Sequence, residues 1–168
     1  MKIGSQSNYF IKIMTTERVR EYLKQFGRDK DVLELDHTSA TVDLAAEALH
    51  VEPARIAKTM SFYSSDKTKC ILVVMAGDKK IDNAKFRAAF DVKSKMLQSK
   101  DVENLTGYAP GGVCPFANPP SAKVYLDVSL KRFDTVFPAC GTSNSAINLT
   151  IEDLEKYSNS QGWVDISK

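Results

Sequence analysis

The chain has 168 residues, 43% hydrophobic and 26% charged, so it can bury its own core and has the composition of a soluble globular protein. Its net charge of +2 does not call for a nucleic-acid partner, and no apolar run approaches the ~20 residues of a membrane helix. The three cysteines form no CxxC pair and the N-terminus lacks a signal-peptide pattern, which argues against a structural zinc site and predicts a cytoplasmic protein with free thiols and no membrane contact.

The N-terminal part of the chain is predicted to be mainly helical. Residues 1–14 are expected to be a lead-in, and residues 15–168 to form one domain. The hydrophobic spacing predicts, in order, a helix through Val19, Tyr22, Leu23 and Phe26, a short strand at 32–35, and a helix over 42–49 that Thr41 caps.

The segment 56–63, IAKTMSFY, is predicted to be a strand that contains an unusual lysine. Two-residue alternation places Lys58 on one face of the strand with Ile56, Met60 and Phe62. An ammonium group among apolar neighbours costs free energy unless it is paired or reaches an opening. Two interpretations follow: an edge-strand lysine whose charge prevents aggregation, or a lysine at the floor or lip of a pocket.

The middle of the chain combines the most apolar strand with a lysine-rich stretch. Residues 69–76, KCILVVMA, predict a central strand that is covered on both faces. The elements expected next are a helix over 81–90 with Phe86, Ala89 and Phe90 inward, a brief strand at 93–97, and a short helix that Ser99 caps. Basic residues outnumber acidic ones from Lys67 to Lys100, which indicates either a solvated surface or a face for phosphates.

Residues 107–120, GYAPGGVCPFANPP, hold three of the eight glycines and four of the six prolines. This density argues against a helix or strand interior and predicts a stiff, partly buried loop. Gly111 and Gly112 leave two N–H groups that could meet an anion or a carbonyl oxygen, with an ordinary tight turn as the alternative. Cys114 is interpreted as a buried, inert thiol in preference to a nucleophile paired with His37.

The last third of the chain is predicted to alternate between short strands and helical turns. The elements expected are strands at 123–127, 135–140, 145–149 and 163–166, a helical turn at 129–133, and a helix over 151–157 that Thr150 caps. The turn 141–145, GTSNS, could donate backbone N–H groups. Because helices and strands mix without strict βαβ alternation, we expect an α/β fold of the mixed α+β kind, with a mixed sheet and flanking helices.

The sequence contains no common catalytic or metal-binding motif. Its two histidines are far apart, and there is no HxxxH pattern, carboxylate cluster, P-loop or GxGxxG motif. No metal and no cofactor are therefore expected. What remains is Lys58 and two glycine-containing turns, which are groups that bind and polarise the oxygen atoms of phosphates, carboxylates and ester carbonyls.

Four segments together resemble the YbaK/prolyl-tRNA-synthetase-associated domain family, in order and at family-like spacing over residues 15–166. The segments are IAKTMSF (56–62), ILVVMAGDKKID (71–82), TGYAPGGVCPFA (106–117) and FPACGTSNSAINLTIEDL (137–154). The resemblance implies a mixed, partly barrel-like central sheet with surrounding helices. It also implies an aminoacyl-tRNA deacylase, with the 3′ end of aminoacyl-tRNA as its partner and a prolyl-tRNA synthetase as a further one.

Carried onto this chain, the resemblance gives Lys58 a catalytic role at the tRNA 3′ end, with Thr59 beside it. Gly111 and Gly112 would shape the aminoacyl pocket and supply backbone donors. The remaining substrate-binding residues expected are Gly141, Thr142 and Ser143 on the opposite wall, with Met60, Tyr108 and Phe116 inferred as further pocket walls from their proximity to these motifs.

The resemblance also accounts for the absence of a protein nucleophile. An aminoacyl ester is already activated, and it can be cleaved by orienting water, or a nucleophile on the substrate itself, against a polarised carbonyl. The turn at Gly141 and Asn148 depart from the cysteine-specific members, so the substrate expected is a small misacylated amino acid (Cys, Ala or Ser) on tRNA, with tRNA(Pro) the tRNA implied. The alternatives are a non-catalytic tRNA- or synthetase-binding module of the same fold, and a deacylase of another small ester.

Overall fold

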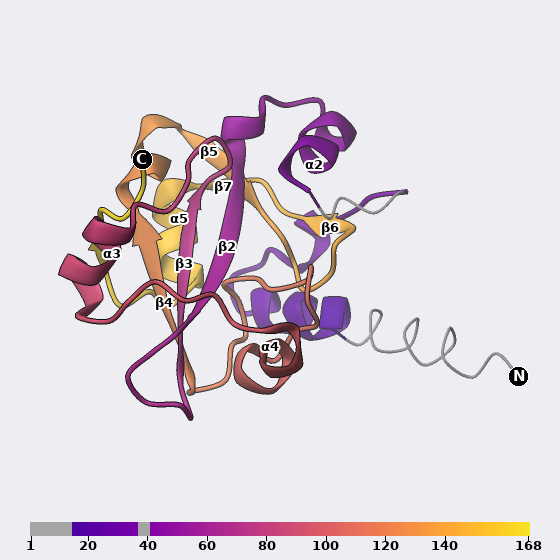
Figure 1. Ribbon diagram of the computed structural model, residues 1–168. Helices are drawn as coiled ribbons and strands as arrows, with labels where there is room; N and C mark the ends of the chain where they lie inside the picture. Colours follow the sequence, from indigo (N-terminus) through magenta and orange to yellow (C-terminus); the bar gives the residue numbers. More distant parts are fainter. Residues whose placement is uncertain (1–14, 37–40) are drawn as a thin grey trace, which may run out of the picture.

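The computed structural model describes residues 15–36 and 41–168 (Figure 1). The expected lead-in at 1–14 and the candidate His37 lie outside the described residues. The chain forms a mixed α+β structure around a curled, six-stranded sheet with the strand order β7-β5-β2-β3-β4-β8. This arrangement confirms the fold class expected from the sequence.

The centre of the sheet is the antiparallel pair β2 (Ile56–Tyr63) and β3 (Cys70–Ala76), in register from Ala57 opposite Ala76 to Tyr63 opposite Cys70. Every residue of β3 is buried, as the continuous apolar run predicted. Strand β4 (Ala122–Asp127) pairs with β3 in parallel, and β8 (Trp163–Val164) pairs with β4.

The outer side of β2 is only partly covered, and this gap determines where the site lies. Strand β5 (Thr135–Pro138) pairs with β2 at Ile56 and Ala57 alone, and continues outward to β7 (Leu149–Thr150). At the far end of β2 the segment 95–97 is hydrogen-bonded to the same edge. Tyr63 N donates to Lys95 O at 2.9 Å, and Leu97 N donates to Ser61 O at 3.0 Å. Between these two contacts, no strand of the described part of the chain pairs with residues 58–60 on that side.

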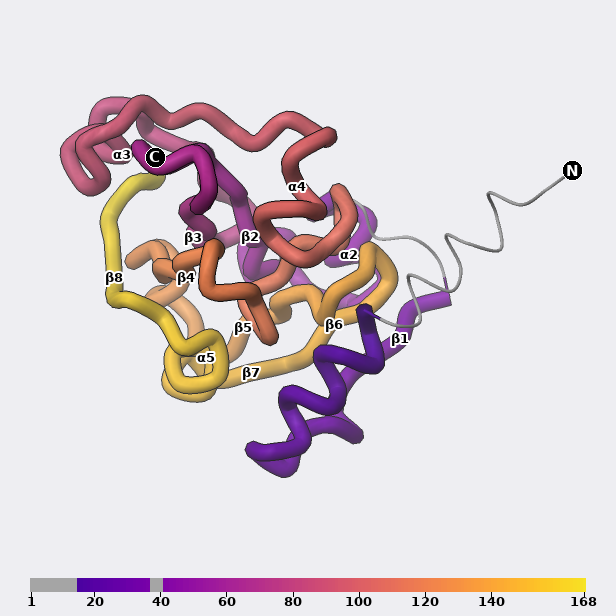
Figure 2. Tube along the Cα trace, turned by 90° about the horizontal axis from the view of Figure 1, so that it is seen from below, coloured from indigo at the N-terminus to yellow at the C-terminus, as the bar shows by residue number. Residues whose placement is uncertain are grey.

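Helices cover both faces of the sheet, and the helix of residues 15–24 and α3 lie on opposite sides of it (Figure 2). One face carries the main core, which includes Val19, Leu72 and Tyr108, together with α4 (Ser99–Thr106) and α5 (Ile151–Tyr157). The other face carries a smaller cluster around Phe62 and Phe86, beneath α3 (Asn83–Phe90).

The remaining elements are α2 and five short elements. Helix α2 (Val42–Leu49) packs through Ala45 and Ala46 against Ile56 and Phe137. The short elements are η1 (Asp29–Asp31), β1 (Leu33–Glu34), η2 (Pro53–Arg55), η3 (Val128–Arg132) and β6 (Ser145–Ala146), the last of which pairs with β1.

Four local predictions were wrong. The strand expected at 93–97 is only a single bridge, between Phe62 and Met96. The strand expected at 145–149 is divided into β6 and β7, which pair with different partners. Ser99 is the first residue of α4 and caps nothing, and Ala89 is exposed.

The lysine-rich stretch extends over both ends of β3. Lys67 precedes β3 and Lys79 follows it, so the length of this strand, about 20 Å, separates them.

Candidate functional site

A cavity of about 440 Å³ occupies the gap beside β2. Its walls come from β2, α2, the segment before α4, the glycine/proline loop, β5 and the turn after it. The predicted site residues that line it are Lys58, Thr59, Met60, Gly111, Thr142 and Ser143. Gly112, Tyr108, Phe116 and Gly141, which were also expected there, do not line it.

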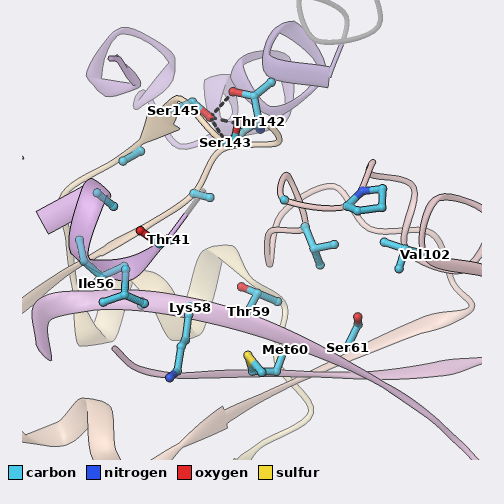
Figure 3. Close-up of a pocket in the computed structure, with 18 of the residues that line it drawn as sticks. Thr41, Ile56, Lys58, Thr59, Met60, Ser61, Val102, Thr142, Ser143 and Ser145 are labelled. Atoms are coloured by element: carbon cyan, nitrogen blue, oxygen red, sulfur yellow. Dashed lines mark hydrogen bonds between the residues drawn. The ribbon is translucent and has the colours of Figure 1, made fainter. Parts of the chain in front are cut away.

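Thr59 provides a polar group on the β2 side of the cavity. Its side chain and that of Ser61 point to the side on which Thr142, Ser143 and Val102 lie (Figure 3). Among the described residues, the Thr59 hydroxyl is the one buried side-chain oxygen or nitrogen that has no hydrogen-bond partner. Because Ser61 and Tyr63 direct their backbone groups to the outer edge, strand alternation directs those of Thr59 there too, towards the gap.

Lys58 and Met60 point to the opposite side of β2 from Thr59 (Figure 3). The Lys58 ammonium donates to Gly77 O at 3.4 Å and to Lys79 O, both in the turn after β3. Burial lowers the pKa of Lys58 below its ordinary value, with Lys80 adding to this effect and Asp78 opposing it. The lysine therefore lies at the border of the cavity, with an ammonium group that is poorly hydrated and held by carbonyls.

The two glycines of the loop have different roles. Gly111 lines the cavity with a left-handed backbone (φ +89°), and a Cβ there would meet only Ser143 Cβ at 3.9 Å. Gly112 is buried, and its N–H donates to Ala109 O at 2.9 Å. This N–H is therefore not available as the predicted donor to a substrate. A Cβ at Gly112 would lie 2.6 Å from Gly141 O, which makes this glycine a point of contact between two loops.

Tyr108 and Phe116 are core residues, which corrects their expected place in the pocket wall. Both are 0% exposed, and the Tyr108 hydroxyl donates to Phe116 O across the base of the loop. Cys114 is also 0% exposed, and burial raises the pKa of its thiol to about 11. A thiol that stays protonated away from solvent is a packing residue and a poor nucleophile.

The turn after β5 closes the cavity opposite β2. Gly141 is buried, and a Cβ there would lie 2.9 Å from Thr15 O. The Thr142 hydroxyl donates to Ser145 Oγ at 2.8 Å, and Ser145 Oγ also accepts from Cys140 N and donates to Thr142 O (Figure 3). These bonds fix the shape of the turn, so Thr142 contributes to the wall mainly through its position.

Several cavity residues were not found from the sequence. They are mainly apolar and come from α2, β5 and the segments around α4: Val42, Ala45, Leu49, Ile56, Leu97, Val102, Val113, Phe137 and Ala139. Their spacing on α2 and β5 is the same as that of core residues, so the sequence carries no signal that separates a cavity wall from a packed core.

The described residues contain no group of three or more His, Cys, Asp or Glu side chains that could hold a metal ion. In the same part of the chain, no helix has the length and apolar character needed to cross a membrane. The arrangement is a chamber lined mainly by apolar side chains, with a cationic group at its border. Its polar lining includes the hydroxyls of Thr41, Thr59, Ser61 and Ser143.

Comparison with known proteins supports the resemblance seen in the sequence. The family model of the aminoacyl-tRNA editing domain matches residues 36–157. The uncharacterised protein YwhH of Bacillus subtilis (strain 168) is 49% identical over 155 residues, which are 92% of this chain and 98% of that protein. An Enterococcus faecalis protein with the provisional name Cys-tRNA(Pro)/Cys-tRNA(Cys) deacylase EbsC is 31% identical over 127 residues, 75% of this chain and 76% of that one.

A solved structure supports the same assignment at the level of the fold. It is described as a candidate trans-editing enzyme for prolyl-tRNA synthetase and is 26% identical, with a TM-score of 0.81 over 92% of this chain and 97% of that one. The chain therefore belongs to the aminoacyl-tRNA editing domain family.

Proposed function

We propose that this protein is a trans-editing deacylase that hydrolyses the ester between a small misacylated amino acid and the 3′ end of a tRNA. The observation that carries the proposal is the Thr59 edge of β2, where a buried hydroxyl that has no partner among the described residues lies beside a largely apolar chamber. Buried polar groups are normally paired, so this edge is suited to a ligand that brings its own polar atoms.

The proposed reaction divides the substrate between the two sides of β2. The aminoacyl group enters the chamber, where the backbone N–H groups of Thr59 and Gly111, two residues that line the cavity, polarise the ester carbonyl. Lys58, at the border and on the other side of the strand, meets the phosphate or ribose of the terminal nucleotide. Hydrolysis then needs only an oriented water molecule or a nucleophile on the substrate, because the ester is already activated.

The names of two similar proteins suggest the substrate. EbsC is named for Cys-tRNA(Pro) and Cys-tRNA(Cys), and the solved structure is described as trans-editing for prolyl-tRNA synthetase. We therefore propose tRNA(Pro) charged with Cys, Ala or Ser as the substrate, the cytoplasm as the location, and a prolyl-tRNA synthetase as a partner. Small amino acids need separate editing because a pocket discriminates a methylene by only about 1–3 kcal/mol.

A panel of charged tRNAs tests the proposal. Release of free amino acid is measured with tRNA(Pro) carrying Cys, Ala, Ser or Pro, and with Cys, Ala and Ser on their own tRNAs. We expect at least one misacylated tRNA(Pro) to turn over well above the uncatalysed rate, while Pro-tRNA(Pro) is spared. If no member of the panel is hydrolysed faster than background, the deacylase proposal fails, and tight tRNA binding in the same samples would support a non-catalytic binding module.

Thr59→Val tests the polar edge of β2 directly, because valine has nearly the shape of threonine without the hydroxyl. We expect kcat/KM to fall about tenfold through the loss of one hydrogen bond to the substrate. The protein itself should be unchanged or slightly more stable, since the hydroxyl has no partner in the free protein.

Thr59→Ser is the matched control, because it keeps the hydroxyl and removes a methyl group. Its kcat/KM should stay closer to wild type than that of Thr59→Val. Equal activity of Thr59→Val and wild type would show that the hydroxyl does not contact the substrate.

A further inference from the structure

The turn after β3, residues 77–81, is tied to the last residues of the chain. Lys80 N donates to Lys168 O at 3.1 Å, and Lys168 N donates back to Lys80 O at 2.9 Å. Ile81 forms a bridge with Ser167, and Asp82 N donates to Ile166 O at 2.8 Å. The C-terminus accordingly lies beside α3 and the end of β3 (Figure 1).

A single buried carboxylate anchors this C-terminal segment. Asp127 is 0% exposed and accepts hydrogen bonds from Ile166 N at 2.9 Å, Ser167 Oγ at 2.7 Å and Ser129 N at 3.0 Å. Ser129 Oγ in turn accepts from Ala76 N at 3.1 Å, at the last residue of β3. A carboxylate withdrawn from water is costly unless several donors satisfy it, and here those donors connect β3, η3 and the C-terminus.

The same turn holds the ammonium group of Lys58. Its Gly77 and Lys79 carbonyls accept from Lys58 Nζ. Arg132 forms a bidentate ion pair with Asp78 of this turn. Its Nη2 and Nη1 atoms donate to the two carboxylate oxygens at 2.6 and 3.0 Å. The charged groups that act on Lys58 are Asp78 and Lys80, both of which belong to this turn.

We propose that Asp127 and the C-terminal residues Ile166–Lys168 are positioning residues for Lys58. They fix the turn that presents the two carbonyls, and the carbonyls keep the long lysine side chain against the border of the cavity. Holding a long lysine side chain in one place costs rotamer entropy, so a loosened turn would release it to solvent. The catalytic part of this inference rests on the proposed function, whereas the placement of Lys58 does not.

The experiment measures the titration of Lys58 in the full-length protein. Lysines are labelled with a trace amount of acetic anhydride across a pH series, and peptide mass spectrometry reads the labelling of Lys58. Lys67, at the other end of β3, serves as the reference for reagent exposure. The variants are Asp127→Asn and the milder Ser167→Ala, with Ser158→Ala as a matched control, because Ser158 is a buried serine whose hydroxyl bonds to Glu155 O in α5.

We expect the pKa of Lys58 to rise towards 10.5 in Asp127→Asn, and by less in Ser167→Ala, because the ammonium group becomes hydrated. The Ser158→Ala control should keep the wild-type titration. In the deacylation assay, kcat/KM should fall about tenfold in Asp127→Asn, together with this shift.

The Lys58 titration tests the positioning role, and the deacylation assay tests the proposed function. An unchanged Lys58 titration in Asp127→Asn that is folded by circular dichroism would overturn the positioning role; should that variant not fold, an unchanged titration in Ser167→Ala would do so. If Asp127→Asn shifts the Lys58 titration but the wild-type protein hydrolyses no misacylated tRNA, the positioning role is supported and the proposed function is rejected.

Discussion

Replacing Lys58 by methionine is expected to reduce deacylation by about 100-fold or more, the loss typical of removing one electrostatic contact at a reacting centre. Methionine has a similar unbranched apolar side chain, one heavy atom shorter than that of lysine, and it lacks the charge and its donors. The assay is release of amino acid from whichever misacylated tRNA the panel identifies. Because Lys58 points away from Thr59, we expect the effect to require the nucleotide, so a minimal aminoacyl ester without tRNA should lose much less.

The same variant should not be less stable than wild type at pH 7. Folding withdraws the Lys58 ammonium from water, and the resulting fall in its pKa means that the folded state holds this proton less tightly than the unfolded state. That cost is fully present below the folded pKa and disappears as pH rises through it towards 10.5. Urea unfolding should therefore show wild type gaining stability relative to Lys58→Met as pH is raised.

Lys80→Met is the control for charge. Lys80 is an exposed neighbour in the turn after β3, and its side chain does not line the cavity. Its loss should leave deacylation within about threefold of wild type, as expected for an exposed charge. An equal loss of activity in both variants would indicate that general positive charge, and not the held ammonium of Lys58, binds the substrate.

The central strands were predictable because their signals are local. The alternation in 56–63 and the continuous apolar run before Gly77 need no information from elsewhere in the chain, and both strands were found nearly to the residue. The strand expected at 145–149 failed because its pairing is not local. Its first residues bond to β1 and its last to β5, so no single partner keeps it straight.

The site was only partly predictable, because the cavity lies where strand β2 lacks a pairing neighbour, and this depends on segments distant in the sequence. The gap beside β2 exists because β5 pairs with β2 only as far as Ala57, and because the segment 95–97 bonds to β2 only from Ser61 onward. The sequence of the segment 56–63 contains no signal of where either neighbour stops pairing with it. Proximity in sequence was also misleading: Tyr108 and Phe116 flank the two glycines but face the core, since the loop turns its aromatic side chains inward.

Gly112→Ala is expected to destabilise the fold by about 3 kcal/mol, at the upper end of overpacking effects. The added methyl would lie 2.6 Å from Gly141 O and 3.1 Å from Gly141 C, and backbone atoms cannot move aside as a side chain can. The glycine/proline loop and the turn after β5 would have to separate. Since Gly111 and Ser143 line the cavity from these two segments, activity should fall with stability.

Gly27→Ala is the control that distinguishes the steric effect of the Gly112–Gly141 contact from ordinary backbone strain. Gly27 has a left-handed backbone (φ +71°), and a Cβ there would meet nothing within 4 Å. Its substitution should cost about 1 kcal/mol through strain alone and leave deacylation unchanged. The free energy of unfolding and kcat/KM are measured for both variants. If Gly112→Ala costs no more than Gly27→Ala and keeps its activity, the two loops are not held together by backbone contact, and the cavity wall does not depend on Gly112.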